Sequence, residues 1–141
     1  NRPPRDVPPT SARALVGGTS RGGLFFDPTV LVDVAPGMRI LQEETFGPIA
    51  PLVRFTHDAE AVAAANGTPF GLAAYLWTRD LTRAFRVSEA LDFGIVGVND
   101  GLPSAPQAPF GGVKASGLGR EGGKWGIEEF LDLKYVSIAL G

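Results

Sequence analysis

Residues 72–98 read LAAYLWTRDLTRAFRVSEALDFGIVGV, and this segment carries the clearest structural pattern in the chain. Its two ends, 72–77 and 93–98, are short apolar runs typical of buried strands. Between them, residues 80–91 place apolar side chains on one side at helical spacing and charged side chains largely on the other. A helix that joins two apolar strands predicts an α/β layer with parallel strands.

Shorter patterns extend this layer in both directions along the chain. Upstream, residues 25–32 form a strand pattern interrupted by a proline, and residues 49–55 form another. Residues 58–65 are rich in alanine and predict a helix. Downstream of a long glycine- and proline-rich stretch, the sequence predicts a short helix at 124–130 and a final strand at 134–139.

These patterns divide the chain into three parts. Residues 1–23 carry several prolines and arginines and predict an exposed arm or linker. Residues 24–123 form the main α/β body, and residues 124–141 hold the last helix and strand. Because no element follows that strand, we expect it to pair outside its own layer, with another subunit as one candidate partner.

The composition of the 141 residues is that of a folded globular protein, with 44% hydrophobic and 20% charged residues. A net charge of −2 leaves no basic footprint for nucleic acid. The lack of cysteine excludes disulfides, thiolate zinc sites and a cysteine nucleophile within this sequence, and the single histidine excludes a histidine-rich metal site. No run of about 18 apolar residues is present, so the sequence predicts no membrane span.

The segment Gly117-Leu118-Gly119-Arg120-Glu121-Gly122 matches the G-x-G-x-x-G pattern of dinucleotide-binding loops. That pattern binds a dinucleotide only between a strand and a helix, with an acidic residue about 20 positions later. No clear strand pattern precedes it here, and no second strand with its acid follows. The segment is therefore interpreted as a glycine-rich turn.

Two other loops hold candidate site residues. Glu43-Glu44-Thr45-Phe46-Gly47-Pro48 lies between two predicted strands, where α/β proteins place ligand-binding groups. A carboxylate there can accept hydrogen bonds from the two vicinal hydroxyls of a ribose, or the segment is simply an exposed acidic turn. Ser104 follows the strand at 93–98 and is either a turn residue or a hydroxyl donor to a carboxylate.

Three blocks taken in order resemble the NAD(P)-dependent aldehyde dehydrogenases. Residues 43–48 resemble the Glu-Glu-x-Phe-Gly-Pro motif of that family, and residues 66–74 (NGTPFGLAA) and 109–121 (PFGGVKASGLGRE) resemble two later blocks. The segment from Thr78 to Asn99 is most similar to the succinate-semialdehyde dehydrogenase branch. The resemblance runs from about residue 12 to residue 140 and leaves residues 1–11 outside it.

The resemblance implies roles for four residues. Glu44 is expected to hold the ribose hydroxyls next to the nicotinamide of NAD or NADP, with Phe46 packed near that ribose. Phe110 is expected to line the aldehyde tunnel, and Ser104 to bind the distal carboxylate of the substrate. Pro103 and a second proline beside Ser104 depart from the pattern of the branch, which leaves the identity of the aldehyde open.

The family mechanism uses a cysteine nucleophile, which forms a thiohemiacetal and then a thioester, and a glutamate that activates water. Both residues lie upstream of the Glu43 block in the family, so the resemblance implies no catalytic residue in these 141 residues. The lack of cysteine and the single histidine predict no metal site.

We therefore expect the C-terminal part of an aldehyde dehydrogenase catalytic domain plus a terminal oligomerisation strand, inactive alone. The whole enzyme is expected to be a cytoplasmic homo-oligomer that oxidises a small aldehyde, succinate semialdehyde above all. The alternative is a non-catalytic remnant that acts as an assembly module through its last strand.

Overall fold

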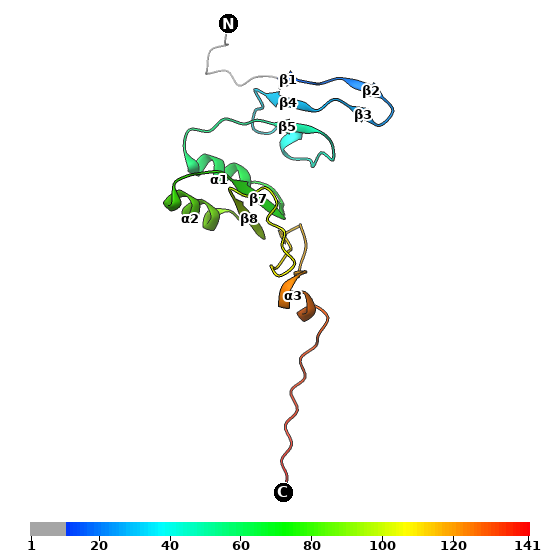
Figure 1. Ribbon diagram of the computed structural model, residues 1–141, viewed down its shortest axis with the longest axis vertical. Coiled ribbons are helices and arrows are strands. Elements are labelled where there is room, and N and C mark those ends of the chain that lie inside the picture. Colours follow the sequence, from blue (N-terminus) through cyan, green and yellow to red (C-terminus); the bar gives the residue numbers. More distant parts are fainter. Residues whose placement is uncertain (1–10) are drawn as a thin grey trace. The chain divides into compact units, whose positions relative to one another are not determined.

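A computed structural model describes residues 11–141, and the chain in it divides after Thr56 into two compact units (Figure 1). Among these residues, all three α-helices lie in the second unit. Parallel and antiparallel strand pairs both occur beside the helices, in agreement with the expected α/β class. No helix in the described part of the chain is long and apolar enough to cross a bilayer.

The first unit is built on a three-stranded sheet in the order β1 (Arg13–Val16), β4 (Thr29–Val32), β5 (Ile49–Pro51). Strand β1 runs antiparallel to β4, whereas β5 runs parallel to it. Strands β2 (Ser20–Gly22) and β3 (Phe25–Phe26) form a small antiparallel pair, and a short 3-10 helix, η1 (Arg39–Leu41), precedes the acidic turn. The strand pattern expected at 49–55 is thus realised only at its start.

Strands β1 and β2 correct the expected exposed arm at residues 1–23. The backbone of Arg13–Val16 pairs with that of Thr29–Val32, so these residues satisfy their hydrogen bonds within a sheet despite being exposed. The prolines that suggested an arm all lie in residues 1–10, which are outside the described residues. Residues 13–22 contain no proline, so nothing prevents their backbone from pairing in strands.

Thr29 anchors the first unit. Its side chain is 4% exposed, and its hydroxyl donates to the Asp27 carbonyl at 2.7 Å. The same hydroxyl oxygen accepts from the Gly18 amide at 2.8 Å, while the Thr29 amide donates to the Pro48 carbonyl at 2.7 Å. One buried residue therefore joins β4 to the segment before it and to the end of the acidic turn.

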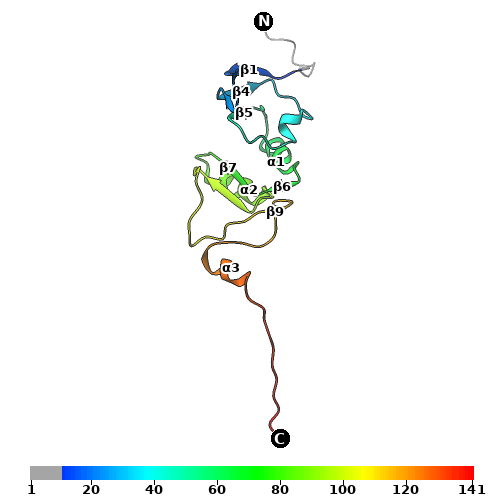
Figure 2. The same ribbon diagram turned by 90° about the vertical axis from the view of Figure 1, so that its right-hand side faces the viewer.

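The second unit contains the predicted strand–helix–strand arrangement. Strand β7 (Ala73–Leu76), helix α2 (Leu81–Ala90) and strand β8 (Ile95–Val98) follow one another, and β7 pairs with β8 in parallel from Ala73↔Ile95 to Leu76↔Val98. The remaining elements are α1 (Asp58–Asn66), β6 (Phe70–Gly71), β9 (Val113–Lys114) and α3 (Gly123–Glu128), with β6 antiparallel to β9 (Figure 2).

Two helices of this unit are held together by charged side chains. Asp58, the first residue of α1, accepts hydrogen bonds from Arg83 Nε at 3.1 Å and from Arg86 Nη2, both on α2. Helix α2 begins after Asp80, whose carboxylate accepts from the Arg83 amide at 3.0 Å. The polar face that the sequence pattern assigned to α2 is therefore the face that binds α1.

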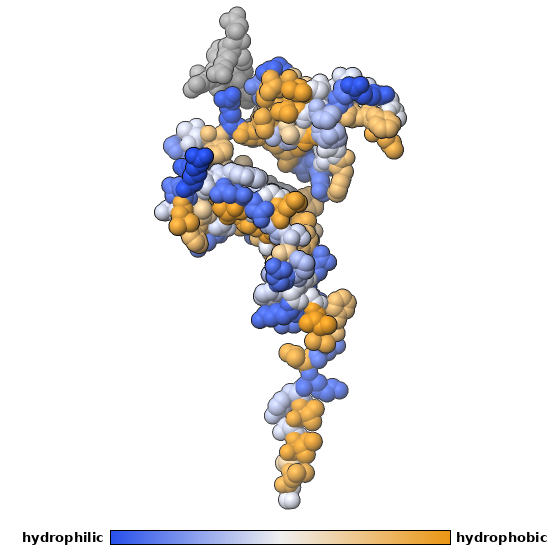
Figure 3. Space-filling view, in the orientation of Figure 1, coloured by the Kyte–Doolittle hydropathy of each residue, from blue (hydrophilic) through white to orange (hydrophobic). Residues whose placement is uncertain are grey.

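The strand expected at 134–139 is not formed. Residues 131–141 are extended and carry no strand pairing in the described part of the chain (Figure 2). A strand needs a hydrogen-bonded neighbour as well as an apolar pattern, and the pattern alone suggested this one. Figure 3 shows hydrophobic residues exposed along this extended C-terminal segment. Leu133 and Tyr135 are 104% and 90% exposed.

The apolar core is small in both units. Among residues 11–141, the buried hydrophobic core consists of Val34 and Ile95, which are 7% and 9% exposed. Large apolar side chains on β3, α2 and α3 are exposed instead, such as Phe25, Phe85 and Ile127. The described residues therefore present far more apolar surface than a folded monomer of this size normally leaves in water.

Candidate functional site

The acidic turn holds two neighbouring glutamates in different states. Glu43 lies four residues after Arg39 and receives two hydrogen bonds from its guanidinium, Nε to Oε1 at 2.9 Å and Nη2 to Oε2 at 2.8 Å. This pairing lowers the pKa of Glu43 and raises that of Arg39. Glu44 is exposed and has no hydrogen-bonding partner within residues 11–141. Its carboxylate is the one that remains able to accept hydrogen bonds from a ligand.

Phe46 lies two residues further on, with its side chain 97% exposed. The turn after it is tight, because the Gly47 amide donates to the Thr45 carbonyl at 2.9 Å and the Ile49 amide donates to the Gly47 carbonyl at 2.8 Å. Pro48 then enters the contact with Thr29 described above. The backbone of the turn is thus fixed at its end, whereas Glu44 and Phe46 present free side chains.

The second pair of expected site residues lies in one long loop of the second unit. Ser104 is exposed and lies six residues before Phe110, which is partly buried. Phe110 is held through its backbone, since its amide donates to the Glu121 carbonyl at 2.7 Å and its carbonyl accepts from the Glu121 amide at 2.8 Å. This bridge fixes the position of the aromatic residue relative to the glycine-rich turn.

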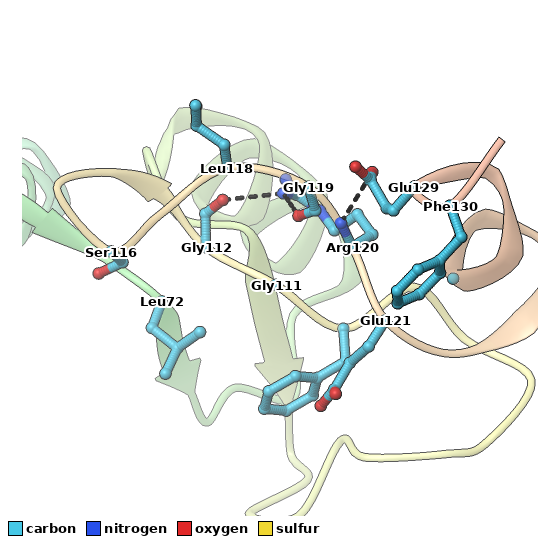
Figure 4. Close-up of a pocket in the computed structure, with 12 residues that line it drawn as sticks. Leu72, Gly111, Gly112, Ser116, Leu118, Gly119, Arg120, Glu121, Glu129 and Phe130 are labelled. Atoms are coloured by element: carbon cyan, nitrogen blue, oxygen red, sulfur yellow. Dashed lines mark hydrogen bonds between the residues drawn. The ribbon is translucent and has the colours of Figure 1, made fainter. Parts of the chain in front are cut away.

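Phe110 lines a pocket of about 440 Å³, a volume suited to a small molecule. Figure 4 shows that its walls come from the 110–112 segment, the 116–121 turn, Leu72 and the end of α3. Arg120 Nη1 donates to the Gly112 carbonyl at 2.8 Å and to the Gly119 carbonyl, and the Arg120 amide donates to Glu129 Oε1 at 3.1 Å (Figure 4). Ser104 is not among the residues that line this pocket.

The glycine-rich segment 117–122 is a turn, as predicted. Gly117, Gly119 and Gly122 all have positive φ, and no strand leads directly into the segment in the way a dinucleotide-binding loop requires. A Cβ atom at Gly119 would lie 2.8 Å from Glu129 Oε2, so the turn also packs closely on the residues after α3. Of these three glycines, Gly119 lines the pocket.

Two residues that bind the second unit together were not recognised as important from the sequence. Lys114 Nζ donates to the carbonyls of Asn66 and Thr68, both at 3.2 Å, pairs with Asp92 at 3.4 Å and lies 5.3 Å from the Phe93 ring centroid. Asn99 forms a two-bond contact with Thr78, described below. No local pattern marks either residue, because their partners lie about 20 or more positions away in the chain and most are backbone groups.

The expected site residues therefore fall into two pairs. Glu44 and Phe46 share the acidic turn of the first unit, and Ser104 and Phe110 share the loop after β8 in the second. The described residues contain no group of three His, Cys, Asp or Glu side chains able to hold a metal ion. The arrangement offers carboxylate, hydroxyl and aromatic contacts to ligands, and the sequence contains no cysteine to act as a nucleophile.

Comparison with known proteins gives a consistent result. The model of the aldehyde dehydrogenase family matches residues 6–136. Succinate-semialdehyde dehydrogenase [NADP(+)] GabD of Escherichia coli is 59% identical over 131 residues, which cover 92% of this chain and 27% of that protein. Glutarate-semialdehyde dehydrogenase of Pseudomonas putida is 54% identical over 135 residues, or 96% of this chain and 28% of that protein.

A solved structure gives the same relation in three dimensions. The crystal structure of an NADP-dependent enzyme of E. coli superposes with a TM-score of 0.87 at 59% identity and covers 92% of this chain and 27% of its own. The chain therefore spans little more than a quarter of the length of the relatives that it matches.

Proposed function

This chain belongs to the aldehyde dehydrogenase family, and we propose on that premise that it contributes to an NAD(P)+-dependent enzyme that oxidises a semialdehyde to the dicarboxylic acid. The observation that carries the proposal is the 59% identity over 131 residues to a succinate-semialdehyde dehydrogenase. That match spans the acidic turn, the loop after β8 and the pocket wall. Succinate semialdehyde is the proposed substrate, with glutarate semialdehyde as the nearest alternative.

Glu44 and Phe46 would hold the nicotinamide half of the cofactor. A ribose presents two vicinal hydroxyls, and the Glu44 carboxylate is exposed and unpaired among the described residues, whereas Glu43 is committed to Arg39. The exposed ring of Phe46 offers an apolar surface beside it. When bound, NAD(P)+ accepts a hydride from the substrate. The residues of the acidic turn orient the ribose and so restrict the geometry of that transfer.

Ser104 and Phe110 would bind the aldehyde. The hydroxyl of Ser104 is exposed and can donate a hydrogen bond to the distal carboxylate of a semialdehyde. Phe110 lines the pocket, and its ring would contact the methylene chain. This division of roles gives the enzyme a way to prefer an aldehyde that carries an anionic group at its other end.

The chemical step would need groups from outside these 141 residues. Covalent oxidation of an aldehyde through a thioester requires a thiolate nucleophile, and the sequence contains no cysteine. We therefore propose that this chain supplies binding and orientation, and that nucleophile and general base reside elsewhere in the enzyme.

Residues 131–141 would supply the contact between subunits. The segment is extended, exposed and apolar along most of its length, and its backbone has no strand partner among the described residues. Addition of such a segment to a sheet edge of another copy satisfies its amides and carbonyls. Removal of residues 131–141 should therefore convert the oligomer into a smaller species, as measured by light scattering.

The proposal is tested by steady-state kinetics of the full-length polypeptide that carries this sequence. We expect NAD(P)+-linked oxidation of succinate semialdehyde with a kcat/KM well above that for butanal, which has the same chain length and no carboxylate. The 141 residues alone should be inactive. Activity of the isolated 141 residues would overturn the assigned division of roles. An inactive full-length protein that still assembles would instead support the non-catalytic assembly module.

A further inference from the structure

The side chain of Asn99 clamps the segment that follows β7. Its Oδ1 accepts a hydrogen bond from the Thr78 amide at 2.9 Å, and its Nδ2 donates to the Thr78 carbonyl at 2.8 Å. The Asn99 amide also donates to the Leu76 carbonyl at 2.8 Å. The last residue pair of the parallel ladder is Leu76↔Val98. The backbone amide of Asn99 thus adds one hydrogen bond beyond the last pair of the ladder. Its side chain then makes two further bonds to the backbone of Thr78, as a neighbouring strand would.

The backbone of Asn99 turns the chain sharply at the same point. Its φ of 55° lies in the left-handed region, which asparagine tolerates better than most residues. The next carbonyl, that of Asp100, folds back over Gly97, where a Cβ atom would lie only 2.4 Å from it. The Asp100 carboxylate then accepts from the Leu102 amide at 2.9 Å. Hydrogen bonds therefore hold Asn99, Asp100 and Leu102 in the loop that leads to Ser104.

Two aromatic side chains, one on β7 and one directly after it, lie beside this loop. Tyr75 and Trp77 are stacked with their ring centroids 6.3 Å apart. A Cβ atom at Gly97 would lie 2.9 Å from Tyr75 and 3.4 Å from Pro103, so the ring, the strand and the returning loop leave no spare space. Pro103 restricts the backbone directly before Ser104. The loop from Asn99 to Pro103 is thus restricted by the hydrogen bonds of Asn99 at its start and by its close approach to Gly97 at Pro103.

From this geometry we infer that Asn99 is a positioning residue that sets the affinity of the enzyme for the carboxylate end of its substrate, through the loop that carries Ser104. The inference rests on the proposed function, in which Ser104 donates to that carboxylate. A hydroxyl on an exposed loop binds an anion well only when the loop is already ordered. Otherwise the conformational entropy lost by the loop on binding weakens the affinity. Asn99 supplies that constraint without touching the substrate.

The chain offers a matched control at the opposite end of β8. Asn66 makes the same kind of two-bond contact, with Nδ2 donating to the Ala90 carbonyl at 2.8 Å and Oδ1 accepting from the Asp92 amide at 2.8 Å. This contact joins the end of α1 to the segment before β8 and leads to no substrate-binding loop. Substitution of Asn66 should therefore change stability without changing the preference between substrates.

The test compares Asn99→Asp with Asn66→Asp in the full-length enzyme. Aspartate retains the left-handed tendency and the acceptor for the Thr78 amide but replaces the donor to the Thr78 carbonyl with a negatively charged oxygen. Asn99→Gly, which permits the same φ and adds no charge, is measured beside it and should show the same selective rise in KM if positioning rather than charge repulsion is the cause. We expect the KM for succinate semialdehyde to rise about tenfold in Asn99→Asp, the size of effect expected when one hydrogen bond to a charged group is weakened. The KM for butanal and both kcat values should stay within about twofold of wild type. Asn66→Asp should leave the ratio of the two KM values unchanged.

A double variant separates positioning from a structural effect. If Asn99 acts through Ser104, Asn99→Asp should add little to the KM change of Ser104→Ala. Faster hydrogen exchange of the Leu102 amide in Asn99→Asp would report the loosened loop directly. If Asn99→Asp does not fold, Asn99→Gly, which also permits φ near 55°, carries the same comparison.

The outcomes distinguish this inference from the proposed function. An equal rise in KM for both aldehydes, or full additivity with Ser104→Ala, would overturn the role of Asn99 while the wild-type preference for the semialdehyde stands. A wild-type enzyme that shows no preference between succinate semialdehyde and butanal would overturn the substrate assignment and this inference together.

Discussion

The two glutamates of the acidic turn show how neighbouring residues of one type acquire different functions. The Glu43 side chain is committed to the guanidinium of Arg39, one helical turn earlier in the chain. Glu44 points its carboxylate to solvent, with no partner within residues 11–141. A ligand that approaches Glu44 displaces only water, whereas a ligand at Glu43 would first have to break an ion pair.

We predict that Glu44→Gln lowers kcat/KM of the full-length enzyme by about 10- to 100-fold, because an amide accepts hydrogen bonds from a ribose less strongly than a carboxylate does. The effect should appear in the rate of hydride transfer, measured as a larger isotope effect with a deuterated aldehyde. Glu43→Gln is the matched control and should leave kcat/KM within about twofold, since it breaks only an exposed ion pair. Equal losses in both variants would refute the assignment of Glu44.

At the scale of elements, the local sequence predicts where helices and strands lie, whereas specific hydrogen bonds determine where they begin and end. Helix α2 begins directly after Asp80, where the carboxylate caps the Arg83 amide. Strand β7 ends at Leu76, one residue before the end of the predicted run 72–77, because it leads into the turn that Asn99 holds. Strand β8 starts two residues later than the predicted run 93–98 and ends with it at Val98. Apolar periodicity locates an element, and a specific donor or acceptor ends it.

The cap of α2 predicts a pH dependence. The pKa of Asp80 lies below its ordinary value of 3.8, chiefly because the Arg83 amide donates to the ionised carboxylate. A carboxyl whose pKa is lowered by folding stabilises the folded state above the unfolded pKa and loses that contribution as the pH falls through the folded pKa. We therefore expect Asp80→Asn to be less stable than wild type at neutral pH and equally stable well below pH 3.8. Thermal melts of the full-length protein at both pH values measure the difference.

The cause of this pKa shift can be tested separately by NMR titration of Asp80. Arg83→Gln keeps the backbone amide that caps the helix and removes only the side-chain charge, which contributes less to the shift. The pKa of Asp80 should therefore stay depressed in Arg83→Gln. A return to the ordinary value would show that charge, rather than capping, lowers it.

Gly94, directly before β8, lies so close to the 110–112 segment that no side chain fits at this position. A Cβ atom at Gly94 would lie 1.9 Å from the Gly111 carbonyl oxygen, so alanine there forces the 110–112 segment to move. We expect Gly94→Ala to destabilise the full-length protein by about 1–3 kcal/mol, as measured by urea unfolding. Gly101→Ala is the control, because the nearest atom to its Cβ lies 4.0 Å away. A neutral Gly94→Ala variant would contradict this close approach.

At the scale of the whole molecule, the apolar residues are mostly not in a core. Trp77, Phe85 and Phe130 are 67%, 61% and 86% exposed, and the buried hydrophobic core of the described part consists of Val34 and Ile95. A parallel pair of strands such as β7 and β8 is normally covered on both faces and continued by further strands. The exposed surface of the described residues is therefore as apolar as a protein interior, and we expect other polypeptide to cover it.

We predict that the isolated 141 residues bind a hydrophobic dye such as ANS and unfold without a sharp transition, because so little apolar surface is buried. The full-length protein is the control and should bind little dye and melt cooperatively. Dye fluorescence and differential scanning calorimetry measure both properties. A cooperative melt of the isolated 141 residues without dye binding would contradict the prediction.

The sequence by itself determined the class of the fold, the existence of α1, α2, β7 and β8, and the family, since the three ordered motif blocks span most of the chain. These features depend on local periodicity and on residue identity, which a sequence displays directly. It also indicated that the glycines of 117–122 form a turn, because their neighbours lack the context of a cofactor loop.

Only the tertiary structure decided which polar groups meet. The clamp of Asn99 on Thr78, the contact of Lys114 with the end of α1 and the bridge between Phe110 and Glu121 all join residues to backbone groups distant in the chain or across a turn. Backbone donors and acceptors are the same at every position, so no sequence pattern marks the one that is used. The same reason explains residues 131–141, whose apolar pattern shows the capacity to form a strand, while strand formation itself depends on a neighbour that supplies the hydrogen bonds.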